Sequence, residues 1–242
     1  MTRFEKSGLW GALALLTAGA VVAVWSPPDA IQGDYVRIMF VHVPSAWLAF
    51  LAFGVAMAAS ITWLVKRSPT ADAVAASSVS VGVFFTALAL LTGMIWGRPV
   101  WGTFWDWGDA RMMTTAVMFF VYLGYLALRR AIDDPLQRAR RSAVLGVVAF
   151  AQVPIVHFSV VWWRTLHQGP TIVRPDPTID GRMLAALLVN LFTFTVIYVV
   201  LVLFRLRLSS AEESLRARML SAENPLAGSA VASPDLEVLR NA

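Results

Sequence analysis

Cysteine is absent from this chain of 242 residues, and only three histidines are present. The missing cysteines exclude disulfides, thiol redox relays, thiolate metal sites and cofactor attachment through a C-x-x-C-H motif within the chain. Common catalytic templates are missing too: there is no phosphate loop, no H-E-x-x-H, no nucleophile elbow and no pair of carboxylates in an apolar segment. We therefore expect a protein that is not an enzyme.

Apolar residues are what the chain has in excess. They make up 58% of the sequence, and the mean hydropathy is +0.66, whereas soluble domains contain roughly 45–50% apolar residues. Crossing a hydrocarbon core of ~30 Å takes ~20 helical residues, and helices satisfy their own backbone groups in lipid. The sequence predicts an all-α, polytopic integral membrane protein with six transmembrane helices. The expected spans are approximately 8–25, 44–65, 76–96, 112–129, 142–163 and 183–204.

The first apolar run has a second interpretation. Arg3 and Lys6 precede the run Gly8–Trp25, as they would in a signal peptide. The run is longer than a usual signal-peptide core and ends in a tryptophan, which favours a retained span. Two prolines also carry expectations: Pro44 should lie in the first turn of the second span, where a missing N–H costs nothing, and Pro154 should kink the fifth.

The basic residues fall into two unequal sets around these spans. Fourteen would lie on one side of the membrane: Arg3, Lys6, Lys66, Arg67, Arg129, Arg130, Arg138, Arg140, Arg141, Arg205, Arg207, Arg216, Arg218 and Arg240. Six would lie on the other: Arg37, Arg98, Arg111, Arg164, Arg174 and Arg182. The larger set is cytoplasmic by the positive-inside rule, so both termini are expected inside and the loops 26–43, 97–111 and 164–182 outside. This also explains the net charge of +5 without a nucleic-acid partner.

One expected outer loop is unusually rich in tryptophan. Residues 96–111 read WGRPVWGTFWDWGDAR, and their glycines and proline argue against a long regular helix. The indoles suit a membrane-interface belt or a flat apolar ligand stacked on their faces. Eight of the ten tryptophans map to the outer side. A belt would divide them more evenly, so the ligand is the favoured interpretation.

All three histidines map to the outer half of the protein. His42 lies just before the second span, His167 just after the fifth, and His157 ~9 Å inside the fifth helix. A single loop histidine is usually a surface hydrogen-bonding group. Their grouping beside the tryptophan loop instead favours haem, because histidine is a common axial ligand of haem iron. His42 and His167 are the candidate ligands. His157 is expected to form a hydrogen bond in the kinked helix, and the alternative is that it serves as a transient ligand.

A porphyrin also carries two carboxylates, which arginine binds in a bidentate manner. The candidate partners are Arg37, Arg98, Arg111 and Arg164. Each of them could instead pair with Asp106 or Asp109, or lie solvated at the membrane surface. Thr114 or Thr115 is expected to cap the following helix.

These segments together resemble a known family. The run at 96–111 is similar to the tryptophan-rich "WWD" signature of haem-handling proteins in cytochrome c maturation. HVPSAW at 42–47 and HFSVVWWRTLHQGPT at 157–171 are similar to the CcmC subfamily, and the resemblance extends to about residue 208. Two departures occur: Phe104 replaces the first paired tryptophan, and Gly108 is inserted before Asp109.

The resemblance implies a multi-pass protein of the bacterial inner membrane that binds haem b non-covalently and transiently at its periplasmic side. It implies His42 and His167 as the axial ligands. Further haem-binding positions would be Trp96, Trp101, Phe104, Trp105, Trp107, Asp109 and Arg111. Residues 1–208 would form the membrane domain, and 209–242 a polar cytoplasmic tail.

The implied partners are the haem chaperone CcmE, which receives the haem, the ATPase CcmA, the membrane subunit CcmB, the small subunit CcmD and membrane lipid. Haem export across the membrane is a further implied activity. One alternative is a haem–apocytochrome c ligase of the wider superfamily, although the short outer loops offer little docking surface. Another is an ion or proton pathway through His157, which the scarcity of polar residues in the spans disfavours.

Overall fold

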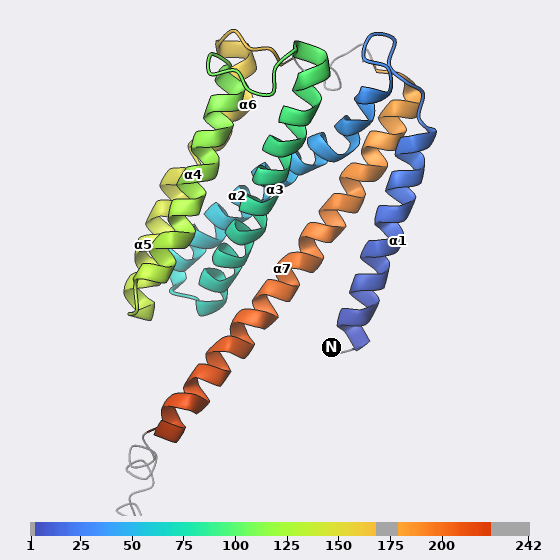
Figure 1. The fold of residues 1–242 in the computed structure, drawn as a ribbon. Coiled ribbons are helices and arrows are strands. Elements are labelled where there is room, and N and C mark those ends of the chain that lie inside the picture. The colour runs from blue at the N-terminus through green and yellow to red at the C-terminus, as the bar shows by residue number, and fades with distance from the viewer. Residues whose placement is uncertain (1–2, 168–178, 224–242) are drawn as a thin grey trace, which may run out of the picture. The chain divides into compact units, whose positions relative to one another are not determined.

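The computed structural model describes residues 3–167 and 179–223, which fold into helices joined by short connections (Figure 1). Six helical segments are long and apolar enough to cross a membrane, so the predicted all-α, six-span architecture is confirmed. The elements are α1 (Arg3–Trp25), η1 (Asp34–Ile38), α2 (Met39–Lys66), α3 (Pro69–Trp101), α4 (Ala110–Ala131), α5 (Pro135–Ala149), α6 (Gln152–Trp162) and α7 (Gly181–Glu223).

The second span begins earlier than the sequence indicated. The 3-10 helix η1 leads directly into α2, which starts at Met39. His42 therefore lies in the first turn of α2 rather than before the span. Pro44 is the sixth residue of the helix and is buried. It therefore lies in the second turn, and its expected place in the first turn is wrong.

The third span ends later than expected. Helix α3 continues through Gly97 and Pro99 to Trp101, so the prediction of a loop is wrong for residues 97–101. Proline in the last turn of a long helix removes a single N–H donor. The Trp101 indole packs directly over Gly97, where a Cβ would lie 2.9 Å from that ring. This packing requires glycine at position 97 and keeps it inside the helix. The helix ends at Gly102, whose positive φ of 79° is a common C-terminal signal.

The fifth span is broken where Pro154 predicted a kink. Helix α5 ends at Ala149, and α6 starts at Gln152. Proline cannot donate to the carbonyl four residues earlier, which belongs to Phe150. That carbonyl instead accepts the N–H of Val153 at 2.9 Å. The predicted kink is confirmed.

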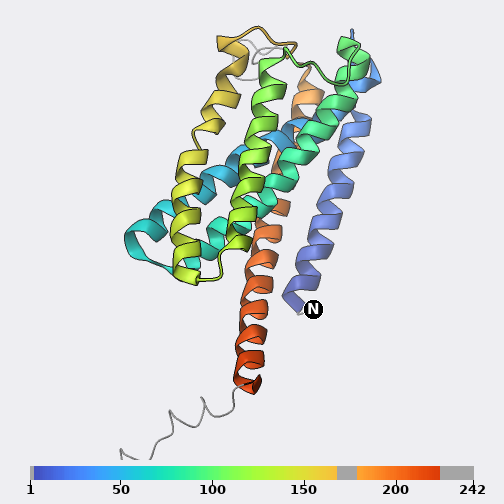
Figure 2. The ribbon, with the colours of Figure 1, turned by 60° about the vertical axis from the view of Figure 1, so that its left-hand side comes forward.

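Helices α2 and α3 form an antiparallel pair, with α4, α5 and α6 beside it (Figures 1 and 2). At the centre, the Phe53 ring stacks on Tyr122 with centroids 3.5 Å apart. Helix α1 and the first part of α7, up to Leu203, are also part of this compact unit. Asn190 donates to the Gly19 carbonyl at 3.1 Å and so joins these two helices.

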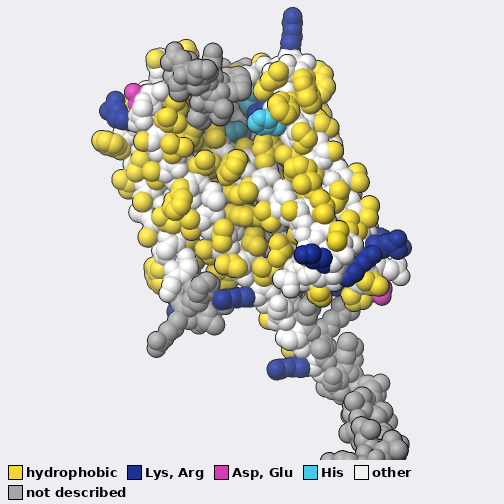
Figure 3. All heavy atoms as spheres, turned by 180° about the vertical axis from the view of Figure 1, so that it is seen from behind, with side chains coloured by type: hydrophobic (Ala, Val, Ile, Leu, Met, Phe, Trp, Pro, Cys, Tyr) yellow, Lys and Arg dark blue, Asp and Glu magenta, His cyan; other side chains and the backbone are white. Residues whose placement is uncertain are grey.

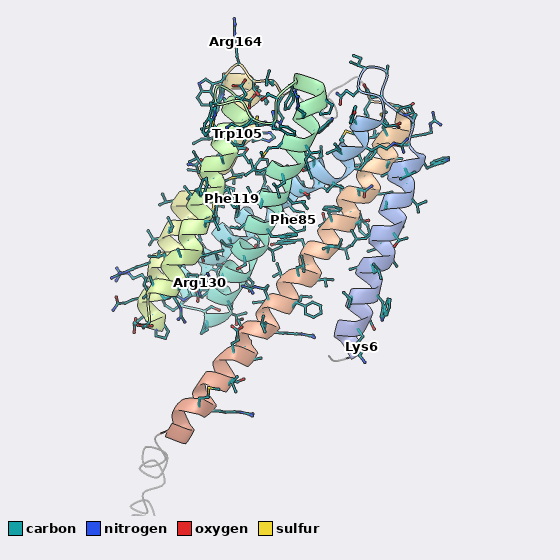
Figure 4. The ribbon with its side chains drawn as sticks, viewed as in Figure 1. Lys6, Phe85, Trp105, Phe119, Arg130 and Arg164 are labelled. Carbon is teal, nitrogen blue, oxygen red and sulfur yellow. The ribbon has the colours of Figure 1, made fainter. Side chains whose placement is uncertain are left out.

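The connections at residues 26–38 and 102–109 lie at the same end of this unit as the segment after α6 (Figure 1). Trp105 and Arg164 lie at that end, called here the outer end, while Lys6 and Arg130 lie at the opposite end (Figure 4). On the face shown in Figure 3, apolar side chains cover much of the surface between the ends. This arrangement is what the predicted topology requires, and the assignment of the outer end to the periplasm stays a prediction.

Residues Phe204–Ala242 form a second unit, whose described part is helical to Glu223. Helix α7 crosses residue 208 without a break. The division into a membrane domain at 1–208 and a tail at 209–242 stays a prediction. The segment GSAVASPD, expected to be disordered, lies outside the described residues.

Candidate functional site

A cavity of about 70 Å³ lies between α2, α3, α4 and α6, close to the outer end. Four of the predicted haem-site residues line it: His42, Trp101, Arg111 and His167. The remaining lining is small or apolar apart from Thr115. The structure thus brings together, on one cavity, two histidines that are 125 positions apart in the chain.

His42 is held from the α3 side. Its Nδ1 lies 3.1 Å from the hydroxyl oxygen of Thr92. That hydroxyl donates its own hydrogen to the Leu88 carbonyl at 2.7 Å, so it accepts from His42. Nδ1 therefore carries the proton, and Nε2 keeps a free lone pair. Gly93 makes room for the ring, because a Cβ there would lie 3.0 Å from the imidazole Cε1.

His167 follows α6 in an irregular segment that is fixed by Asp109. One carboxylate oxygen of Asp109 accepts the Thr165 hydroxyl at 2.6 Å and the Leu166 amide at 2.7 Å. The Thr165 oxygen in turn accepts the His167 amide at 3.1 Å. These bonds tie the beginning of α4 to the segment that carries His167. Asp109 also caps the start of α4, because its side chain accepts the Met112 amide at 2.8 Å. The expected cap at Thr114 or Thr115 is therefore wrong.

The contacts of Asp109 also determine its charge. Burial by itself would raise the pKa of Asp109, but hydrogen bonds from Thr165, Met112 and Leu166 outweigh it and hold the pKa below its usual value. Burial, together with the nearby Arg111 cation, lowers the pKa of His167 to about 4. At neutral pH the site therefore contains an ionised carboxylate beside a neutral imidazole that has a lone pair to offer.

The two imidazoles lie close to each other across the cavity. Their ring centroids are 6.4 Å apart, and the ring planes are inclined by 32°. A metal–imidazole nitrogen bond is about 2.0–2.1 Å long, so two imidazoles on opposite sides of one metal have centroids roughly 6 Å apart. The observed separation matches that arrangement.

Two tryptophans flank this pair. The Trp101 ring centroid lies 4.8 Å from that of His167, and the Trp96 ring lies 5.8 Å from His42 in an edge-on arrangement. The Trp96 indole N–H donates to Gln32 at 2.9 Å, which fixes the ring. Both tryptophans lie in the last turns of α3, the part that was expected to be a loop.

The other aromatic residues of the run lie in the connection between α3 and α4. Phe104 and Trp107 are exposed, at 53% and 78% of their surface. Trp105 packs edge-on against Trp107 with centroids 5.7 Å apart, and it lies at the outer end (Figure 4). None of the three lines the cavity.

The four candidate arginines have different surroundings. Arg111 lines the cavity and donates to the His157 carbonyl at 2.7 Å. Arg37 pairs with Asp34 at 2.9 Å, and Arg98 donates to the Gly102 carbonyl. Arg164 points away from the helices at the outer end (Figure 4). Of these four, only Arg111 touches the cavity.

His157 does not belong to this group. Its imidazole is exposed and lies edge-on to the rings of Phe50 and Phe158. Its backbone carbonyl, rather than its ring, takes part in the hydrogen bond with Arg111.

Sequence reasoning missed three supporting residues: Thr92, Gly93 and Thr165. The sequence offered two signals: a Thr-Gly pair inside an apolar span, and a threonine two positions before a candidate ligand. Neither signal shows which histidine these residues contact.

The amino-acid sequence was also compared with known proteins. The family model described as "Heme exporter protein C", CcmC, matches residues 2–221. A "Heme exporter protein C" of Bradyrhizobium diazoefficiens is 45% identical over 86% of this chain and 77% of its own length. The protein of the same name from Escherichia coli K12 is 38% identical over 82% of this chain and 81% of its own length. A "Putative cytochrome c biosynthesis ccmC-like mitochondrial protein" of Arabidopsis thaliana is 34% identical over 90% of this chain and 86% of its own length.

The family model covers the spans, the tryptophan-rich run and both cavity histidines, and the relatives match over most of their own lengths. The chain belongs to the heme exporter protein C (CcmC) family.

Proposed function

We propose that this protein is a haem-binding membrane subunit of the cytochrome c maturation system, which holds haem b non-covalently between His42 and His167. The observation that carries the proposal is the separation of the two imidazoles, 6.4 Å between centroids, on one cavity. The names of its relatives, which concern haem export and cytochrome c biosynthesis, support the same ligand.

Two protein ligands suit a metal that arrives inside a macrocycle. A porphyrin supplies four nitrogens, so its iron needs only one ligand above and one below. A free metal ion needs more protein ligands, usually three or four. Across residues 3–167 and 179–223, no group of three or more His, Cys, Asp or Glu side chains is placed to hold one.

The size of the cavity limits how haem is held. Pockets that enclose a drug-sized ligand measure ~300–1,000 Å³, whereas this one measures about 70 Å³. A cavity of this size holds only part of a porphyrin, and the rest of the ring would lie outside it. A site that covers only part of its ligand suits a protein that passes the ligand on.

The surrounding residues fit the remainder of a porphyrin. Trp96 and Trp101 offer apolar faces beside the two imidazoles. Arg111 offers a half-buried cation for a propionate, and Arg98 and Arg164 offer exposed ones at the outer end. Phe104, Trp105 and Trp107, which do not line the cavity, are available to an exposed porphyrin edge or to the acceptor.

The orientation in the membrane rests on the charge distribution. We place the outer end at the periplasmic face of a bacterial inner membrane and both termini in the cytoplasm. The haem is passed to the chaperone CcmE, and the protein works with CcmA, CcmB and CcmD, of which CcmA is the ATPase. No catalytic step is assigned to this chain.

A transfer assay tests this proposal. The protein is reconstituted in nanodiscs, loaded with haem and mixed with apo-CcmE, and haem that remains on CcmE after denaturing electrophoresis is measured. The His42→Ala, His167→Ala double variant should bind no haem and transfer none. His157→Ala is the matched control, because this third histidine lies outside the cavity, and it should transfer normally. Normal transfer by the double variant would refute the ligand assignment.

A further inference from the structure

The two cavity histidines differ in what lies behind them. Behind His42 is a neutral hydroxyl, and behind His167 is a buried carboxylate. The group behind a metal-bound imidazole fixes its orientation and tunes its basicity, so this difference bears on how each histidine would bind iron.

On the α2 side, the partner of His42 is weak. Thr92 uses its hydrogen on the Leu88 carbonyl and accepts the Nδ1–H of His42 at 3.1 Å. Both groups are uncharged, and neutral hydrogen bonds are roughly half as strong as charge-assisted ones. The imidazole therefore remains an ordinary neutral ligand.

On the α4 side, the group behind His167 is charged. Asp109 is 2% exposed, and one of its oxygens lies 3.9 Å from the Nδ1 of His167. That nitrogen is buried and has no hydrogen-bond partner in the described residues. A closure of about 1 Å would bring the two atoms into hydrogen-bond range. The carboxylate is held in place meanwhile by Thr165, Leu166 and Met112.

We propose that His167 is the retained axial ligand and His42 the one that is released first, because the carboxylate of Asp109 stands behind His167 and the uncharged hydroxyl of Thr92 stands behind His42. This inference rests on the proposed function. It makes Asp109 a positioning residue that acts through His167, rather than a contact of the haem.

The physical reason is electron donation. An imidazole whose N–H donates to a carboxylate gains imidazolate character and becomes a more basic ligand. It binds ferric iron more strongly than an imidazole whose N–H donates to a hydroxyl. Haem about to leave therefore breaks its bond to His42 and stays on His167, which opens the α2 face of the iron to a ligand from the acceptor protein.

Single-histidine variants test the order of release. His42→Ala should retain haem as a five-coordinate species bound through His167. His167→Ala should bind haem at least tenfold more weakly than His42→Ala. Equal losses of affinity, or the reverse order, would overturn the inference.

A vibrational measurement tests the role of Asp109. Resonance Raman spectroscopy of ferrous His42→Ala should show an iron–histidine stretching frequency raised by the carboxylate. Adding Asp109→Asn should lower that frequency and reduce haem affinity by roughly 10- to 100-fold. The matched control is Asp106→Asn, the same change in the same connection, at a carboxylate that accepts the Gly108 amide at 2.8 Å and does not line the cavity. It should leave the frequency unchanged. An unchanged frequency in Asp109→Asn, or an equal drop in Asp106→Asn, would contradict the role.

The outcomes separate the two proposals. If the unmodified protein shows no six-coordinate haem, the proposed function itself fails. If it shows six-coordinate haem but the two single-histidine variants behave alike, only the order of release fails. If Asp109→Asn does not fold, the comparison of His42→Ala with His167→Ala still decides.

Discussion

The imidazole of His42 lies directly against the backbone of Gly93. A Cβ at position 93 would be 3.0 Å from Cε1 and 3.4 Å from Nδ1 of that ring. These separations are tighter than ordinary contact, so a side chain at position 93 displaces the His42 ring.

Gly93→Ala tests this contact. We expect haem affinity to fall several-fold while the fold is kept, because the ring must shift by a few tenths of an ångström. Absorption titration with haem measures the effect. The control is Gly124→Ala on α4, where nothing lies within 4 Å of the new Cβ and the change should stabilise the helix by about 0.5–1 kcal/mol. Unchanged haem affinity in Gly93→Ala would show that the position of His42 is not set by this contact.

Trp101 and Trp107 belong to the same tryptophan-rich run but have different surroundings. Trp101 lines the cavity, whereas Trp107 is 78% exposed and does not. Trp101→Ala should weaken haem binding by about three- to tenfold, the equivalent of one aromatic contact. Trp107→Ala should leave equilibrium haem affinity unchanged. Equal losses in the two variants would mean that the bound haem contacts the whole run.

Arg129 and Asp72 form a two-bond ion pair at the end opposite to the cavity. The nitrogen–oxygen distances are 2.5 and 2.8 Å, and the side chains are 15% and 18% exposed. Arg129→Gln leaves the carboxylate poorly paired and should lower the free energy of unfolding by roughly 1–3 kcal/mol. Thermal unfolding in detergent measures this, and a double-mutant cycle with Asp72→Asn isolates the pair.

The control for that experiment is the exposed neighbour Arg130. Arg130→Gln should change stability by no more than about 0.5 kcal/mol. Haem affinity should be unaffected in both variants, because neither residue lines the cavity. A large loss of haem binding in Arg129→Gln at temperatures where it is folded would contradict this separation.

Gly82 allows α2 and α3 to approach closely. A Cβ there would lie 2.7 Å from the Phe53 ring, which is itself stacked on Tyr122. Gly82→Ala should destabilise the protein by about 1–3 kcal/mol, since the ring has no free space to move into. Thermal unfolding beside Gly124→Ala checks it. A stability equal to that of the control would show that this packing is loose.

Much of the fold could be predicted from the sequence, because length and hydropathy dictate where a chain crosses a membrane. The six spans and the break before Pro154 are of this kind. The ends of α2 and α3 could not be placed, because a proline or glycine near a helix end interrupts the helix only if the local packing does not compensate. At Gly97 it does, through the indole of Trp101.

The candidate site was predictable to a smaller extent. Residue type and motif pointed to His42 and His167, but their separation across one cavity depends on how four helices pack. The bond between Asp109 and Thr165 joins residues 56 positions apart, and nothing in either local sequence indicates it. A carboxylate next to a tryptophan-rich run could be an ordinary polar loop residue. The sequence does not show that it instead fixes the segment that carries a distant histidine.

The most direct test of the central claim is electron paramagnetic resonance of the ferric haem-loaded protein. With His42 and His167 as axial ligands, the unmodified protein and His157→Ala should both show low-spin ferric iron. His42→Ala should convert that signal to the high-spin signal of five-coordinate haem. A low-spin signal that persists in His42→Ala and in His167→Ala would contradict the claim, because the iron would then have ligands other than this pair.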